Sequence, residues 1–122
     1  MNNNLIISSF LGAITIVLGA FGAHALQENL NVSELKSFET GVRYQMYHVF
    51  VLLFVNTYSK FNAKTKNRIS YLFFIGILFF SGSLYAITFG IPAKSIWFIT
   101  PLGGLFFIIG WIKMGFSFLN KE

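Results

Sequence analysis

Four long apolar stretches, joined by short polar connections, constrain the fold of this chain more than any other feature. They cover roughly residues 5–25, 44–59, 69–89 and 96–112. Each is close to the ~20 residues that an α-helix needs to cross a hydrocarbon core of ~30 Å. Because the chain has only 122 residues, these stretches account for most of it. They predict an all-α integral membrane four-helix bundle, with residues 1–122 forming a single transmembrane domain embedded in the lipid bilayer.

The composition supports this class. Hydrophobic residues make up 55% of the chain and charged residues only 11%, against roughly 25% charged in ordinary soluble domains. The absence of cysteine excludes disulfides and thiolate metal sites. The net charge of +5 could suggest nucleic acid. The basic residues, however, lie between apolar stretches instead of along one polar face, so we expect no nucleic-acid partner.

The distribution of lysine and arginine predicts the orientation in the membrane. With four spans, the N-terminus, the connection at 60–68 and the C-terminus share one side. Six basic residues lie on that side and three on the other. The six are Lys60, Lys64, Lys66, Arg68, Lys113 and Lys121, and the three are Lys36, Arg43 and Lys94. The positive-inside bias therefore predicts a multi-pass protein with both termini in the cytoplasm.

One alternative for the first stretch is a cleaved signal peptide, because Ala23, His24 and Ala25 resemble a small-x-small cleavage site. The leader lacks lysine and arginine, the apolar run exceeds the usual 7–15 residues, and three further stretches follow. We therefore expect the first stretch to be a retained transmembrane helix.

Small residues recur along the predicted helices at spacings of three and four. In the first stretch they fall on one helical face, which would let a neighbouring backbone approach closely. The residues expected to serve helix packing are Ser8, Gly12, Thr15, Gly19, Gly22, Gly82, Ser83, Gly103, Gly104 and Gly110.

The segment before the second stretch carries its own helix signal. Asn31 can act as an N-cap, and Glu34 three residues later completes a capping box. A helix from Val32 to Ser59 would measure about 42 Å, which exceeds the hydrocarbon core. Either an amphipathic first part bends along the membrane surface, with Gly41 as the point of least cost, or an extended helix projects from the bilayer.

Polar residues gather where this second helix enters the membrane. Ionisable groups at membrane depth are costly, so they define the candidate functional site. Glu39 precedes Arg43 by four residues, the favourable order for an ion pair within a helix. The predicted orientation places His24 of the first helix and Tyr85 of the third at the same level of the membrane. The candidate polar cluster comprises His24, Glu39, Arg43, Tyr44, Gln45, Tyr47, His48 and Tyr85.

The chain resembles the small bacterial membrane proteins of domain-of-unknown-function family 423, also called uncharacterised protein family 0382. The segments that carry the resemblance are Gly19–Leu26, Phe38–His48, Ser81–Tyr85, Thr100–Gly104 and Gly110–Trp111. The Arg-Tyr-Gln-Met-Tyr-His string from Arg43 to His48 is the specific part. The resemblance implies four spans in the bacterial cytoplasmic membrane, and it implies no activity.

Three functional hypotheses follow. The first is a non-enzymatic packing or interaction module whose partner is a second copy or a larger membrane protein. The second is a subunit of an oligomeric transporter or channel for protons or small solutes, which would use the polar cluster near the extracytoplasmic face. The third is a metal or haem site between His24 and His48. Because spacing fixes no third ligand, and no catalytic motif occurs, we expect no metal, no cofactor and no enzymatic activity.

Overall fold

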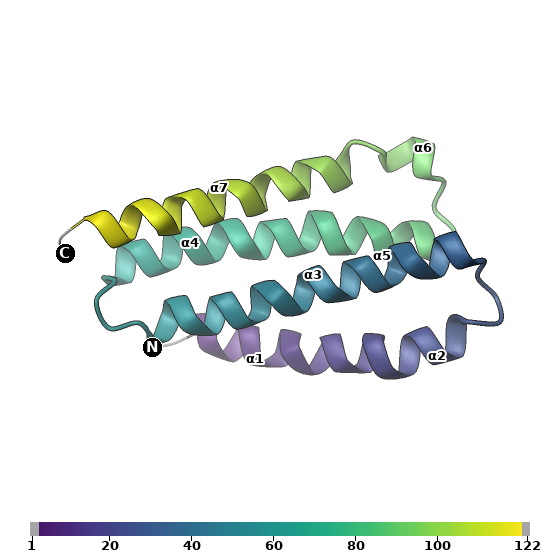
Figure 1. The fold of residues 1–122 in the computed structure, drawn as a ribbon, viewed down its shortest axis with the longest axis horizontal. Coiled ribbons are helices and arrows are strands. Elements are labelled where there is room, and N and C mark those ends of the chain that lie inside the picture. Colours follow the sequence, from purple (N-terminus) through teal and green to yellow (C-terminus); the bar gives the residue numbers. More distant parts are fainter. Residues whose placement is uncertain (1–2, 121–122) are drawn as a thin grey trace.

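Four long helical segments run up and down along one axis in the computed structural model, which describes residues 3–120 (Figure 1). This confirms the all-α, four-helix prediction. Short π-helical turns, labelled η, interrupt two of the segments. In chain order the elements are α1 (Asn3–Ile16), η1 (Val17–Gly22), α2 (Ala23–Leu26), α3 (Val32–Thr57), α4 (Ala63–Gly76), η2 (Ile77–Ser81), α5 (Gly82–Thr88), α6 (Ala93–Ile96) and α7 (Ile99–Leu119).

The second segment, α3, begins twelve residues before the apolar stretch at 44–59 that marks it in the sequence. The predicted capping box is confirmed, since Asn31 Oδ1 accepts from Glu34 N at 2.8 Å and Glu34 Oε1 accepts from Asn31 N at 3.0 Å. The helix continues through Gly41 without interruption. Its 26 residues correspond to about 39 Å. The structure therefore shows the extended helix and not a separate surface segment.

Three of the four segments are long and apolar enough to cross a membrane. They are Asn3–Leu26, Ala63–Thr88 and Ala93–Leu119. α3 is not among them. Its hydropathy is reduced by Arg43 and by three polar residues, Gln45, His48 and Asn56, which are buried inside the bundle.

α3 occupies the centre of the arrangement. α1 packs on one side of it, α4, η2 and α5 pack on another, and α7 packs on α4 and η2 (Figure 1). The apolar core lies where α3, α4 and α7 meet, toward the α3–α4 connection. Its buried members are Leu52, Val55, Phe61, Ile69, Phe73, Ile77, Phe107 and Met114.

The small residues of α1 and η1 lie against α3. A Cβ built on Gly12, Gly19 or Gly22 would meet a side chain of α3 at 3.1 to 3.4 Å, and Ser8 and Thr15 on the same face are fully buried. This contact leaves the opposite face of α1 and η1 exposed, with Ile6, Phe10, Ile14, Val17 and Phe21.

Glycine also sets the approach of α7 to the preceding segment. A Cβ on Gly103 would lie 2.2 Å from the backbone nitrogen of Phe80, so only glycine fits there. Gly110 packs against the ring of Phe73. Gly104 makes only an ordinary contact with Phe80.

Gly82 was expected to serve helix packing, and the structure shows that it does not. A Cβ at this position would meet nothing within 4 Å. The inward positions belong instead to its neighbours, because Ser81 donates to the Gly41 carbonyl at 2.7 Å and Ser83 bonds with Thr100 at 2.5 Å.

Candidate functional site: a hydrogen-bonded polar core

The polar residues of α3 follow the spacing of its buried face. Gln45 is 2% exposed and His48 is 4% exposed, and Asn56 lies two turns further on the same side. A buried polar group costs free energy unless it finds a hydrogen-bond partner, and lipid offers none. Each of these three side chains finds its partners on other helices or on the α3 backbone.

Gln45 joins three helices through both ends of its amide. Its Nε2 donates to Thr15 Oγ1 at 2.8 Å and to the Leu11 carbonyl at 3.3 Å. Its Oε1 accepts from the Tyr85 hydroxyl at 2.8 Å. Because Thr15 also donates to Leu11 O at 2.6 Å, the network connects α1, α3 and α5.

His48 is held between α3 and α7 in a defined tautomer. Its Nδ1 lies 2.6 Å from the Tyr44 carbonyl, which can only accept, so Nδ1 carries the proton. Its Nε2 accepts from Trp111 Nε1 at 3.0 Å. The ring stacks on Phe107 with centroids 3.6 Å apart and an interplanar angle of 7°. The imidazole is therefore neutral and both of its nitrogens are occupied.

Asn56 forms a third polar layer near the α3–α4 connection. Its Nδ2 donates to Ser70 Oγ and to the Leu52 carbonyl, both at 2.8 Å. Its Oδ1 accepts from Asn4 Nδ2 at 3.1 Å, and Asn4 also donates to Asn67 Oδ1 at 2.9 Å. This layer ties α1, α3 and α4 together.

Across residues 3–120, a single buried side-chain polar atom has no hydrogen-bond partner, the hydroxyl of Ser8. Each of the other buried oxygens and nitrogens of the polar layers is satisfied. The polar layers inside the bundle therefore satisfy their hydrogen-bonding groups almost entirely among themselves.

The charged residues of the predicted cluster and its two tyrosines on α3 lie on the outside of that helix. Glu39, Arg43, Tyr44 and Tyr47 are all exposed. Arg43 Nη2 donates to Thr40 Oγ1 at 3.3 Å, and within the described part of the chain no ion pair joins Arg43 to Glu39. These four side chains are exposed, whereas the side chains of Gln45, His48 and Tyr85 face inward.

His24 lies in α2 at a different level from His48. Gly22 faces Phe38 at the start of α3, whereas Gly12 faces Val49, next to His48. Twelve residues of helix separate Gly12 from His24, or roughly 18 Å. His24 is exposed and does not share a site with His48. In the described residues, no group of three or more His, Cys, Asp or Glu side chains is placed to hold a metal ion.

Sequence reasoning missed several members of the polar core. Trp111 is 63 residues from His48, and no local spacing connects them. Asn56, Ser70 and Asn4 also lie outside the predicted cluster. The available signal for Asn56 was an amide within an otherwise apolar stretch, which must find a partner if it is buried.

Helices long and apolar enough to span a bilayer, packed around a saturated polar core, define a small helical membrane protein. The chain belongs to the DUF423 family of proteins of unknown function, whose family model matches residues 18–104.

Named relatives cover most of the chain. A UPF0382 membrane protein of Haemophilus influenzae is 39% identical over 99% of this chain and 98% of its own length. UPF0382 membrane protein SAB0533 of Staphylococcus aureus is 42% identical over 85% of this chain and 88% of its own length. UPF0382 inner membrane protein YgdD of Escherichia coli K12 is 34% identical over 90% of this chain and 84% of its own length. No solved structure gives a significant match.

Proposed function

We propose that the chain is a non-enzymatic packing and interaction module of the bacterial cytoplasmic membrane, which it crosses four times with both termini in the cytoplasm. The names of the relatives support the location, since they describe membrane and inner membrane proteins. The lysine-rich α3–α4 connection supports the orientation, because it carries Lys60, Lys64, Lys66 and Arg68 on the side of both termini.

α3 is the fourth span in this proposal. It is antiparallel to α1 and α4, and at about 39 Å it is long enough to cross the hydrocarbon core (Figure 1). Its low hydropathy comes largely from residues that do not face lipid, because Gln45, His48 and Asn56 point inward. Its outer face beyond Tyr47 is aromatic, with Phe50 and Phe54 exposed.

The observation that carries the proposal is the saturation of the inward polar groups. A proton relay through His48 needs a partner that can exchange protons, but the indole of Trp111 can only donate a hydrogen bond. Gln45 and Tyr85 likewise form a hydrogen bond with one another instead of lining an open path. These contacts favour a core that fixes helix register over a transporter or channel subunit that moves solutes or protons.

The topology can be tested with single cysteines, because the chain has none of its own. Ser33 lies in the first turn of α3 and Ser59 lies just beyond its other end, and both are exposed. A membrane-impermeant maleimide should label Ser33→Cys in intact spheroplasts and Ser59→Cys only after lysis. The reverse result would overturn the orientation. Equal labelling of both cysteines from one side would overturn the fourth span.

The interaction role is tested by cross-linking in native membranes, followed by native mass spectrometry of the extracted protein. A defined homo-oligomer or a stoichiometric larger partner is expected. A strictly monomeric chain with no co-purifying protein, at native expression level, would contradict the proposal.

A further inference from the structure

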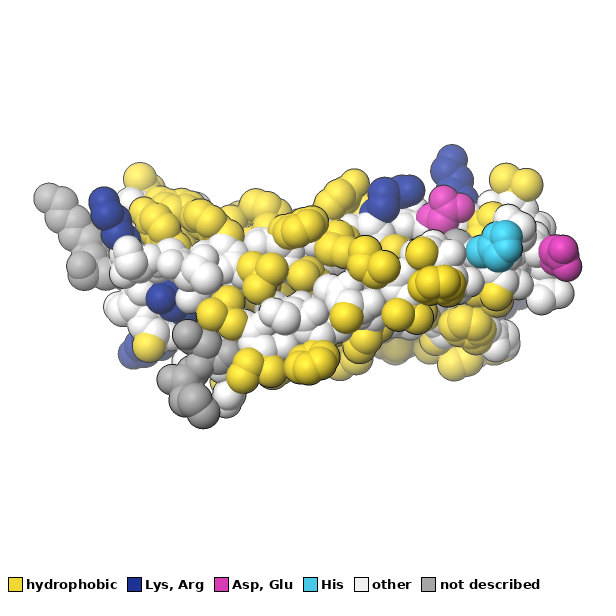
Figure 2. Space-filling model, turned by 90° about the horizontal axis from the view of Figure 1, so that it is seen from below, with side chains coloured by type: hydrophobic (Ala, Val, Ile, Leu, Met, Phe, Trp, Pro, Cys, Tyr) yellow, Lys and Arg dark blue, Asp and Glu magenta, His cyan; other side chains and the backbone are white. Residues whose placement is uncertain are grey.

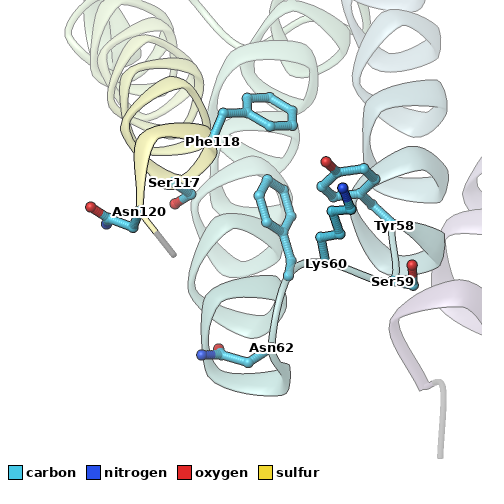
Figure 3. Close-up of a pocket in the computed structure, with 8 residues that line it drawn as sticks. Tyr58, Ser59, Lys60, Asn62, Ser117, Phe118 and Asn120 are labelled. Atoms are coloured by element: carbon cyan, nitrogen blue, oxygen red, sulfur yellow. The ribbon is translucent and has the colours of Figure 1, made fainter. Parts of the chain in front are cut away.

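We propose that a groove at the lysine-rich end of the bundle binds the headgroup of an anionic phospholipid. The inference rests on the membrane placement proposed above and names one lipid partner for the protein. The groove has a volume of about 660 Å³ and opens between the α3–α4 connection and the end of α7 (Figure 3). Its lining residues are Tyr58, Ser59, Lys60, Phe61, Asn62, Ser117, Phe118 and Asn120.

One wall of the groove is aromatic. The ring of Phe61 lies 4.8 Å from Tyr58 and 5.0 Å from Phe118, measured between centroids, and Tyr58 and Phe118 are 5.5 Å apart. Phe54 continues this cluster toward the middle of α3, at 6.3 Å from Phe118. Phe54 is 46% exposed and Phe118 is 48% exposed. The groove is therefore continuous with an outer apolar surface along which an acyl chain can lie.

The other lining groups are polar. Lys60, at the connection, is exposed and supplies an ammonium group, which binds phosphate as a point charge. Asn120, at the end of α7, is exposed and carries an amide that can donate. Ser117 is buried and donates to the Lys113 carbonyl at 2.7 Å, so it shapes the floor of the groove without being free to bind.

The charge of this end complements an anionic headgroup. Lys64, Lys66 and Arg68 follow the groove on α4, and Lys113 lies one turn before Ser117. The glutamates among the described residues lie toward the other end, with Glu28 in the α2–α3 connection and Glu34 and Glu39 near the start of α3. Figure 2 shows acidic side chains gathered at that opposite end. No described acidic side chain therefore offsets the positive charge at this end of the bundle.

The walls favour a lipid over a free phosphate ion. A free ion gains nothing from three aromatic rings, whereas tyrosine and other aromatic residues at a membrane interface pack against the headgroup region and the first methylenes. The volume also lies within the 300–1,000 Å³ typical of small-molecule sites. An anionic phospholipid uses both the charged and the apolar parts of the groove.

The test uses the full chain in detergent micelles doped with phosphatidylglycerol or phosphatidylcholine, and native mass spectrometry reports the lipid retained. One phosphatidylglycerol per chain should be retained in preference to phosphatidylcholine. Lys60→Gln should weaken retention about fivefold, the effect of one basic residue at an anionic surface. Lys94→Gln is the matched control, because it removes the same charge from an exposed position at the opposite end.

A second variant separates a shaped site from general attraction. Ser59→Trp adds a bulky side chain to the lining of the groove and leaves every charge in place. It should abolish one-to-one retention. Unchanged retention in Ser59→Trp, equal losses in Lys60→Gln and Lys94→Gln, or equal retention of both lipids would each overturn the site. Displacement of the lipid by millimolar inorganic phosphate would assign the groove to a free anion instead.

Extraction of the membranes with alkaline carbonate distinguishes this inference from the proposed function. A chain that leaves the membrane in carbonate contradicts the membrane module itself. A chain that stays in the membrane but shows no preference for phosphatidylglycerol contradicts only the lipid site.

Discussion

The approach of α7 to η2 depends on the missing side chain of Gly103, and Gly103→Ala tests this directly. An alanine Cβ at this position would lie 2.2 Å from the backbone nitrogen of Phe80 and 2.8 Å from the carbonyl carbon of Phe79. These are backbone atoms, which cannot rotate away as a side chain can. The two segments must therefore separate by more than an ångström to accept the methyl group.

The expected cost follows from two opposing effects. Overpacking of a tight contact costs about 1–3 kcal/mol, whereas replacing glycine by alanine within a helix gains up to about 1 kcal/mol. Gly103→Ala should therefore lower the free energy of unfolding by about 1–2 kcal/mol. Gly115 lies on the same helix, and a Cβ there would meet nothing within 4 Å. Gly115→Ala should accordingly be neutral or stabilising by up to about 1 kcal/mol.

The assay is equilibrium unfolding in mixed micelles with increasing dodecyl sulfate, followed by far-UV circular dichroism. Gly103→Ala should lower the dodecyl sulfate fraction at the unfolding midpoint. Gly115→Ala should raise this midpoint or leave it unchanged. Gly104→Ala adds a control at the adjacent position, where the nearest atom would lie at 3.9 Å. If Gly103→Ala were as stable as Gly115→Ala, the close contact between α7 and η2 would be refuted.

Two further predictions concern the polar core and use the same unfolding assay. Gln45→Leu should cost about 1–3 kcal/mol because it leaves the Tyr85 hydroxyl without an acceptor. Adding Tyr85→Phe should recover part of this, with a coupling energy of about 0.6–1.7 kcal/mol, and strictly additive losses would contradict the hydrogen bond. Trp111→Phe should cost about 1 kcal/mol because His48 loses its donor. Trp97→Phe, at a 69% exposed position, should change stability by less than about 0.5 kcal/mol, and equal effects of the two tryptophan variants would contradict the contact.

Features that depend on neighbours in the sequence could be predicted. The start of α3 was readable because Asn31 and Glu34 are three residues apart and satisfy each other's backbone groups. The glycines of the first stretch could be assigned to one helical face because their spacing follows the helical period. The number of long helices could be predicted as well, because each apolar stretch is continuous in the sequence and has the length of a membrane-spanning helix.

Features that depend on the partner helix could not be predicted. The sequence suggested Gly41 as a bend, but in the fold its carbonyl accepts from Ser81, 40 residues away. Glu39 and Arg43 have the spacing of an ion pair, yet Arg43 donates to Thr40. Depth along the bundle also needs the packed structure, because the level of His24 relative to His48 depends on which residues of α1 and α3 face each other.

The π-helical turn η2, Ile77–Ser81, sets the direction in which the side chains of α5 face. A π turn holds one more residue than an α-helical turn, so it acts as an insertion built into the helix. If the turn closed into a regular α-helix with all of its residues kept, everything beyond it would rotate by about 100°, the angle of one residue in an α-helix. Ser83 would then turn away from Thr100, and Tyr85 from Gln45, although every side chain in those contacts would still be present. In this segment the width of the turn before α5 matters as much as the identity of the residues in it.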